Sequence, residues 1–373
     1  MPEPERGPGA PARPEGGPVG AAGGAVFASA GDGAGAAVRC DGASDEPGAG
    51  CFTRYRRPAV RDLAWLVFDG ALQLPPGSGT IAAVVLGAEE RAELLELLSQ
   101  WDADEQDDWL GPVAPGLRLG LYVERLIGAW LANSRRIRLL AQNWPLRSSR
   151  MTLGEADLLL QRQGGQGGRQ LWELACKFYL GLPDDRWVGP GLNDTLATKL
   201  DRMRRHQLQL IHQPGFQVAW PGHWSALAWL TGWLLQPAAE ATAARAGRIA
   251  AVWAEAGDAS LASATASASA LGIEQWWLLP KRRWLRPAHG DPAPAECYPS
   301  LQAAEAFIMG PVAPKQRGSD RARPLMLAGM RRMQTGEVAE EMLRLMLVPR
   351  GWSQLAAAMP LQSASSADRS SAP

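Results

Sequence analysis

Two neighbouring segments of the chain combine acidic and basic residues with the alternation of a β-strand. Residues 152–160 read TLGEADLLL, residues 170–181 read QLWELACKFYLG, and a GGQGG run separates them. Alternate residues of a strand share a face and Gly-rich runs favour turns, so the two segments predict a hairpin. Pairing in this hairpin would bring Asp157 near Glu173 and Lys177, so that carboxylates and an amine converge on one side of a sheet.

The second predicted strand has an apolar face and a mixed face. The apolar face is expected in the core and consists of Trp172, Leu174, Cys176, Phe178 and Leu180. The mixed face consists of Glu173, Ala175, Lys177 and Tyr179. As surface ion pairs, its charged residues would contribute only ~0–1 kcal/mol to stability. As a site, they could bind Mg²⁺ through carboxylates, while the lysine orients water or stabilises developing charge. The pattern alone leaves both interpretations open.

Helices are predicted on both sides of the hairpin along the chain. The run LRLGLYVERLIGAWLANS, 117–134, has apolar residues at helical spacing, and Glu124 within it is either an edge or paired acid, or an inward functional carboxylate. The run RIRLLAQNWPL predicts a strand that ends near its proline. Downstream, Asn193 or Asp194 could cap a further helix. The polar face of that helix is either a solvated basic surface or a phosphate contact, and it carries Lys199, Arg202, Arg205 and Gln207.

The overall composition narrows the classes of function. The chain has 373 residues and a formal net charge of zero, which argues against a basic coat over the whole protein. Its four cysteines form no CxxC pair, its four histidines lack metal-ligand spacing, and no P-loop or GxSxG motif occurs. The Pro-rich start has no apolar signal-peptide core, and no run reaches ~18 apolar residues. We therefore expect a cytoplasmic protein without a membrane span.

Shifts in composition along the chain predict one ordered domain between two disordered tails. The Gly-, Ala- and Pro-rich start and the Ser-rich end carry too few apolar residues for a core. The predicted segments are a disordered tail (1–52), a helical N-terminal part (53–115), the α/β core (116–237), a loop or helical insertion (238–272), a C-terminal extension of the same domain (273–356) and a second disordered tail (357–373).

The order helix, three strands, helix and strand, with these acids, resembles the core of the PD-(D/E)XK nuclease superfamily. In that superfamily a helix Glu often precedes the sheet, an Asp ends the second strand, an E-x-K pattern lies on the third, and a helix with Gln or Lys follows. The resemblance implies an α/β fold whose mixed sheet is flanked by helices. More closely, the strings WELACKFYLG and WVGPGLNDTLATKLDRM resemble the bacterial family called domain of unknown function 1853.

The resemblance to nucleases implies metal-dependent hydrolysis of DNA or RNA. Asp157, Glu173 and Glu124 would bind Mg²⁺ or Mn²⁺, and Lys177 would position the nucleophilic water. Contacts to the nucleic acid would come from Lys199, Arg202, Arg205, Gln207, Lys281, Arg282 and Arg283. An E-x-K strand that ends in Lys177 needs an acid at position 175, where this chain has Ala175. The alternative is therefore a catalytically inactive relative that binds nucleic acid or a protein partner.

Overall fold

The computed structural model of the chain describes most of residues 50–360. The described residues are 39–40, 50–104, 108–114, 116–147, 152–164, 168–240, 249–316, 320–332 and 339–360. The predicted disordered tails, 1–52 and 357–373, therefore lie largely outside the described residues. At their inner ends, Cys51–Arg54 form a 3₁₀ helix, η1, and Trp352–Ala357 form helix α8.

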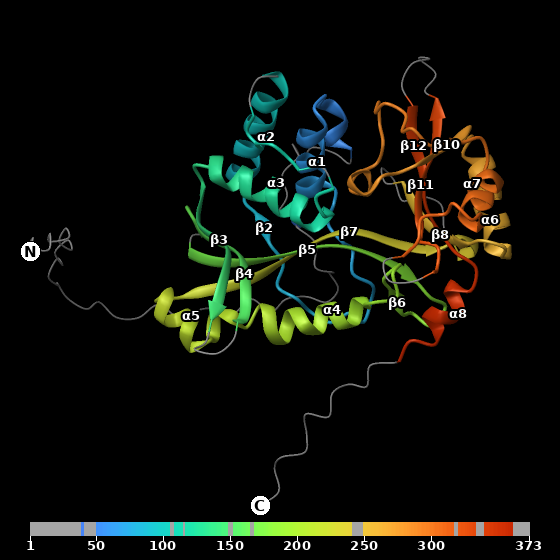
Figure 1. The fold of residues 1–373 in the computed structure, drawn as a ribbon. Coiled ribbons are helices and arrows are strands. Elements are labelled where there is room, and N and C mark those ends of the chain that lie inside the picture. The colour runs from blue at the N-terminus through green and yellow to red at the C-terminus, as the bar shows by residue number, and fades with distance from the viewer. Residues whose placement is uncertain are drawn as a thin grey trace, which may run out of the picture. The chain divides into compact units, whose positions relative to one another are not determined.

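Ten strands form one mixed sheet (Figure 1). The sheet order is β10-β9-β11-β12-β8-β7-β5-β4-β3, and β6 pairs with β5. Within the run β12-β8-β7-β5, each strand is parallel to the next. All other neighbouring strands of the sheet are antiparallel. The strands are β3 (Ile137–Arg147), β4 (Thr152–Arg162), β5 (Gly168–Gly181), β6 (Trp187–Val188), β7 (Trp224–Pro237), β8 (Ala250–Glu255), β9 (Gln275–Leu278), β10 (Cys297–Tyr298), β11 (Leu325–Arg332) and β12 (Ala339–Val348). A separate parallel pair joins β1 (Arg39–Cys40) to β2 (Val85–Leu86).

The centre of the sheet is the long parallel pair of β5 and β7. The two strands pair from Arg169 with Trp224 to Leu180 with Leu235. Gly232 of β7 has φ +126°, and a Cβ there would lie 1.8 Å from the carbonyl oxygen of Lys177 on β5. Only glycine is compatible with this close approach of two backbones. β7 contains the most membrane-like run of the sequence, and no helix among the described residues is long and apolar enough to cross a bilayer.

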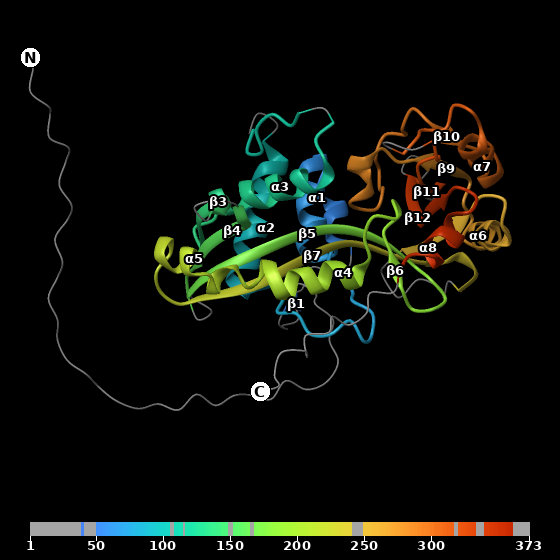
Figure 2. The same cartoon turned by 60° about the horizontal axis from the view of Figure 1, so that its bottom comes forward.

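Helices cover both faces of this central region (Figure 2). On one face lie α1 (Pro58–Phe68), α2 (Ala88–Ala103) and α3 (Leu119–Asn133), packed on a core in which Trp130, Trp172 and Trp229 contact one another. On the other face lie α4 (Leu196–Arg202), a π-helical turn η2 (Met203–Gln207), a 3₁₀ turn η3 (Leu210–His212) and α5 (Pro214–Ala219). Both faces of β5 are thus buried, including the face that the sequence presents as mixed.

The C-terminal strands have helices of their own. They are α6 (Ala259–Ala270), α7 (Leu301–Met309) and α8, with 3₁₀ turns η4 (Ala238–Glu240) and η5 (Lys281–Trp284). Residues 238–272, predicted as a loop or helical insertion, contain strand β8 within the sheet as well as helix α6. The short, Ala-rich strand AAVWAE pairs with β12 over its whole length, so long-range pairing and not local alternation makes it a strand.

The expectation of a mixed α/β fold with helices flanking the sheet is confirmed. Along the chain the elements α3, β3, β4, β5, α4 and β7 follow one another in the predicted order, with β6, the turns η2 and η3, and the short helix α5 inserted. One local detail differs. The N-cap of α4 is Thr195, whose hydroxyl oxygen accepts from the backbone N–H of Thr198 at 3.1 Å, and not Asn193 or Asp194. The carboxylate of Asp194 is instead engaged by Lys177.

Candidate active site

The site begins where β4 separates from β5. The last paired residues are Leu158 and Trp172, so Asp157 is the first residue of β4 beyond the ladder. At this point the backbone N–H of Leu174 donates to Oδ2 of Asp157 at 2.8 Å. The side chain thereby satisfies a donor that strand pairing would otherwise satisfy. Asp157 is held on β5 with one carboxylate oxygen fixed, directly beside Glu173.

Glu173 is the buried partner of this aspartate. Its side chain is only 1% exposed, its Oε1 accepts from Nε2 of Gln207, and its Oε2 makes no hydrogen bond of good geometry with the described residues. Burial, and then the neighbouring Asp157, raise the pKa of Glu173 to about 9. Burial also raises the pKa of Asp157. Two carboxyl groups in one buried place cannot both ionise without a cation, so the pair is a natural position for positive charge.

The amine linked to this pair comes from helix α4 and not from the strand. Nζ of Lys199 donates to Oε1 of Gln207 at 2.8 Å, and the same amide donates to Glu173. Burial lowers the pKa of Lys199, whereas the carboxylates of Glu173 and Asp157 act in the opposite direction. The three side chains Lys199, Gln207 and Glu173 therefore form a continuous hydrogen-bonded series beside Asp157.

The π-helical turn after α4 explains how Lys199 and Gln207 meet. In a regular α-helix, residues eight positions apart are rotated by about 80° around the axis. The wider π turn of Met203–Gln207 reduces this offset and brings Gln207 to the face that carries Lys199. Such single π turns are frequent at functional sites. The sequence contains both residues, but their meeting depends on this turn.

Lys177, the amine that the strand pattern singles out, is engaged elsewhere. Its Nζ lies 2.8 Å from Oδ2 of Asp194, and the hydroxyl of Tyr179 donates to the same oxygen at 3.3 Å. Both members of the Lys177–Asp194 pair are about one-third exposed. The structure therefore brings Asp157 and Glu173 together as predicted, but directs Lys177 toward Asp194.

Glu124 approaches the acids from α3. Burial, and then the nearby Asp157, raise the pKa of this half-buried carboxyl, and Asn143 of β3 is its hydrogen-bonding neighbour. Among the described residues, however, no group of three or more Asp, Glu, His or Cys side chains is arranged to hold a metal ion. The predicted set of Glu124, Asp157 and Glu173 is thus not gathered as one three-acid cluster. The close pair is Asp157 and Glu173.

Position 175 is part of the core. Ala175 is 7% exposed and belongs to the apolar cluster that contains Leu200 and Met203 from the α4 side. A carboxylate at this position would lose its hydration against those side chains. The acid of the strand is Glu173, two residues earlier and next to Asp157.

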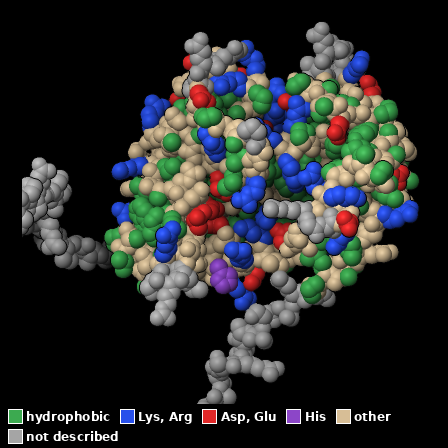
Figure 3. Space-filling view, in the orientation of Figure 1, with side chains coloured by type: hydrophobic (Ala, Val, Ile, Leu, Met, Phe, Trp, Pro, Cys, Tyr) green, Lys and Arg blue, Asp and Glu red, His purple; other side chains and the backbone are tan. Residues whose placement is uncertain are grey.

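The basic residues predicted to contact nucleic acid lie on two faces of the sheet. Arg202 and Arg205 are exposed on the α4 side, where Arg205 pairs with Asp201 at 2.6 Å. Lys281, Arg282 and Arg283 belong to η5, whose Trp284 packs edge-on against Phe178 on the opposite face of β5. Of these two groups, only Arg202 and Arg205 lie on the same face of the sheet as the acidic pair. In Figure 3 acidic and basic side chains lie next to one another near the middle of the viewed face, close to the position of α4 in Figure 1.

The fold and this site define a class of protein: a mixed α/β protein with a buried carboxylate pair at the point where two central strands separate, and a lysine from the following helix beside it. The family comparison is specific. Residues 61–348 match the family Domain of unknown function (DUF1853), and the chain belongs to this family. No curated protein and no solved structure matches the chain.

Proposed function

We propose that the protein is a metal-dependent phosphodiesterase that cleaves DNA or RNA. The observation that carries this proposal is the buried pair of Asp157 and Glu173, with the ammonium of Lys199 linked to it through Gln207. The order of α3, β3, β4, β5, α4 and β7 supports it, because this is the order of elements in the PD-(D/E)XK nucleases that the sequence resembles.

The donor set fits a magnesium ion. Mg²⁺ is held in proteins through one or two carboxylates and completes its shell with water and substrate phosphate. Asp157 and Glu173 would supply the carboxylates, and Oε2 of Glu173 is a buried acceptor without a well-oriented donor. When bound, the ion would neutralise the pair and polarise the scissile phosphate. Glu124 would act through water on the α3 side.

Lys199 would position the nucleophilic water, the role that the resemblance to nucleases assigns to the lysine of the E-x-K strand. With Glu173 as the strand acid, the residue two positions later is Ala175, so the strand itself supplies no amine at that place. An amine is linked to Glu173 from α4 instead, because Lys199 donates to Gln207 and Gln207 donates to Glu173. Its part would be to orient the attacking water and to stabilise negative charge on the phosphate oxygens. Gln207 would hold both Lys199 and Glu173 in position, and Arg202 and Arg205 would contact the substrate backbone.

The test is cleavage of single- and double-stranded DNA and RNA with Mg²⁺ or Mn²⁺. Asp157→Ala and Glu173→Gln should abolish cleavage, and Arg282→Ala, on the opposite face of the sheet, should leave it unchanged. Cleavage by both acid variants at the wild-type rate would contradict the proposal. So would a wild-type protein that binds neither metal at this pair.

A second function, nucleic-acid binding without catalysis, is favoured by one observation. The described residues gather only two acids closely, and position 175 is apolar. Calorimetric titration discriminates the two functions. An inactive relative would bind nucleic acid with wild-type affinity in Asp157→Ala and would take up no Mg²⁺ or Mn²⁺.

A further inference from the structure

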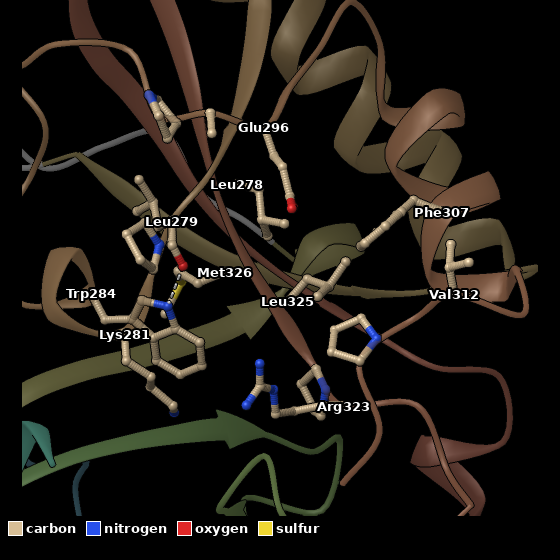
Figure 4. Close-up of a pocket in the computed structure, with 15 residues that line it drawn as sticks. Leu278, Leu279, Lys281, Trp284, Glu296, Phe307, Val312, Arg323, Leu325 and Met326 are labelled. Carbon is tan, nitrogen blue, oxygen red and sulfur yellow. Dashed lines mark hydrogen bonds between the residues drawn. The ribbon is translucent and has the colours of Figure 1, made fainter. Parts of the chain in front are cut away.

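A separate cavity lies among the C-terminal elements (Figure 4). Its volume is about 450 Å³, within the range of pockets that enclose small molecules. Strands β9 and β11, turn η5 and the end of α7 contribute its walls. The side chains of Leu278, Trp284, Phe307, Val312, Leu325 and Met326 give it a mostly apolar surface.

One end of the cavity is positively charged. Nζ of Lys281 lies 3.4 Å from the centre of the Trp284 ring, and that ring is fixed by a 2.9 Å hydrogen bond from its Nε1 to the carbonyl oxygen of Leu279. Arg323 lies close enough that, after burial, its charge is the main cause that lowers the pKa of Lys281 to about 8. Within the described part of the chain, neither cation forms an ion pair with an acid. Two adjacent, unneutralised cations at the rim of an apolar cavity define a place for an anion.

The other end carries an acid. Figure 4 shows the carboxylate of Glu296 directed into the cavity from the side away from Lys281 and Arg323. The backbone at each end is anchored: Leu278 N–H donates to the carbonyl of Glu296 at 3.0 Å, and Arg323 N–H donates to the carbonyl of Pro314 at 2.7 Å. Glu296 forms no ion pair with either cation of the same cavity. A matching ligand is therefore anionic at one end, apolar in the middle, and a hydrogen-bond donor at the other end.

We propose that this cavity binds a purine nucleotide. The phosphate would lie between Lys281 and Arg323, the ring would pack against Phe307 and the other apolar side chains of the walls, and the carboxylate of Glu296 would accept from the N–H groups of the base edge. Guanine fits better than adenine, because its ring N–H and amino group present two adjacent donors to one carboxylate. The site lies on the face of β5 opposite the acidic pair and does not depend on the proposed nuclease activity.

The nucleotide can come from two sources, the free molecule or the end of a nucleic-acid strand, and the experiment separates them. Calorimetric titration of the full chain in EDTA would compare GMP, AMP, guanosine, inorganic phosphate and a short oligonucleotide with a 5′-phosphorylated terminal guanosine. We expect GMP to bind about tenfold more tightly than guanosine or phosphate, since a hydrogen bond to a charged group is worth about that factor. Tighter binding of GMP than of the oligonucleotide identifies the free nucleotide, and the reverse identifies the strand end.

Matched variants test the positions. Lys281→Ala and Arg323→Ala should each weaken GMP binding by about tenfold or more, and Glu296→Gln should reduce the preference for GMP over AMP. Arg282→Ala, a neighbouring exposed cation outside the cavity, should bind GMP as the wild type does. Val312→Trp, at an exposed position on the rim, should block the cavity without disturbing the core. Wild-type binding of GMP in the Lys281 and Arg323 variants, equal binding of phosphate and GMP, or no binding of GMP would overturn the proposal.

Discussion

The backbone N–H of Leu174 and the carboxylate of Asp157 form a 2.8 Å hydrogen bond at the residue where β4 leaves β5. This bond holds Asp157 beside Glu173, whose own side chain is buried and accepts from Gln207. The consequence is a carboxylate pair at the point where β4 and β5 separate, and Gln207 links Lys199 of α4 to this pair. The tests below follow from this arrangement.

The first test asks which lysine acts in the proposed cleavage. Lys199→Ala should lower the cleavage rate by about 10²-fold or more, because charge stabilisation by one preorganised group has that magnitude. Lys177→Ala, which removes only a pair with Asp194 whose members are about one-third exposed, should stay within about tenfold of the wild type. Single-turnover cleavage measures both, with melting curves as a control for folding. The reverse order of the two variants would assign the role to Lys177.

In the absence of metal, the free energy of unfolding should depend on pH because Glu173 gains and loses its proton at different pH values in the folded and unfolded states. Its pKa is about 9 in the folded protein, against the ordinary value of 4.5, so between these values the folded state holds a proton that the unfolded state lacks. Stability should therefore be greatest at the acid end of this window and should fall as pH rises toward about 9. Glu173→Gln keeps an acceptor for Gln207 but cannot ionise.

The Glu173→Gln variant should accordingly show a flatter dependence of the free energy of unfolding on pH, and should be more stable than the wild type at the alkaline end. Urea denaturation in EDTA at a series of pH values measures this. Identical slopes for wild type and variant would show that Glu173 is not held protonated.

Salt dependence of nucleic-acid binding should distinguish the two basic faces. Arg202 is exposed beside the acidic pair, and its replacement by Ala should reduce the slope of log K against log salt by about one unit. Arg283 lies in η5 on the opposite face, where its guanidinium donates to the carbonyl of Pro292 at 2.8 Å. Arg283→Ala should leave the slope as it is. Fluorescence anisotropy over a salt series provides the comparison, and equal losses for both arginines would place the substrate across both faces.

The close pairing of β5 and β7 should make Gly232 irreplaceable. A Cβ at this residue would overlap the carbonyl of Lys177, so Gly232→Ala should destabilise the fold by more than about 2 kcal/mol. Gly222 also has a positive φ, +112°, but its nearest neighbour is a flexible arginine tip at 3.7 Å. Gly222→Ala should cost only about 1 kcal/mol. Chemical denaturation would test this, and equal effects at both sites would contradict the backbone overlap.

Local pattern alone was enough to predict the hairpin of β4 and β5, the helix of Glu124, and the closeness of Asp157 and Glu173. These features follow from periodicity and from the pairing of neighbours in sequence, since a hairpin is specified by short-range alternation and a turn. The same pattern showed a mixed face on β5 and left open whether its charges were surface ion pairs or part of a site. In the structure, α4 covers that face. The chain returns across this side of the sheet after β6, and the alternation within β5 does not predict to which side it returns.

Only the tertiary structure shows whether Lys177 or Lys199 lies beside the acidic pair. By strand alternation Lys177 lies on the same face of β5 as Glu173. The turn before α4, however, places the carboxylate of Asp194 against its ammonium, and the two charges pair. Lys199 is distant from the acids in sequence. It is linked to Glu173 through Gln207 only because α4 packs across β5 and a π turn aligns Lys199 with Gln207. The sequence determined which residue types were present on each element, whereas the packing of a helix across the sheet decided which of two lysines is linked, through Gln207, to the carboxylate pair.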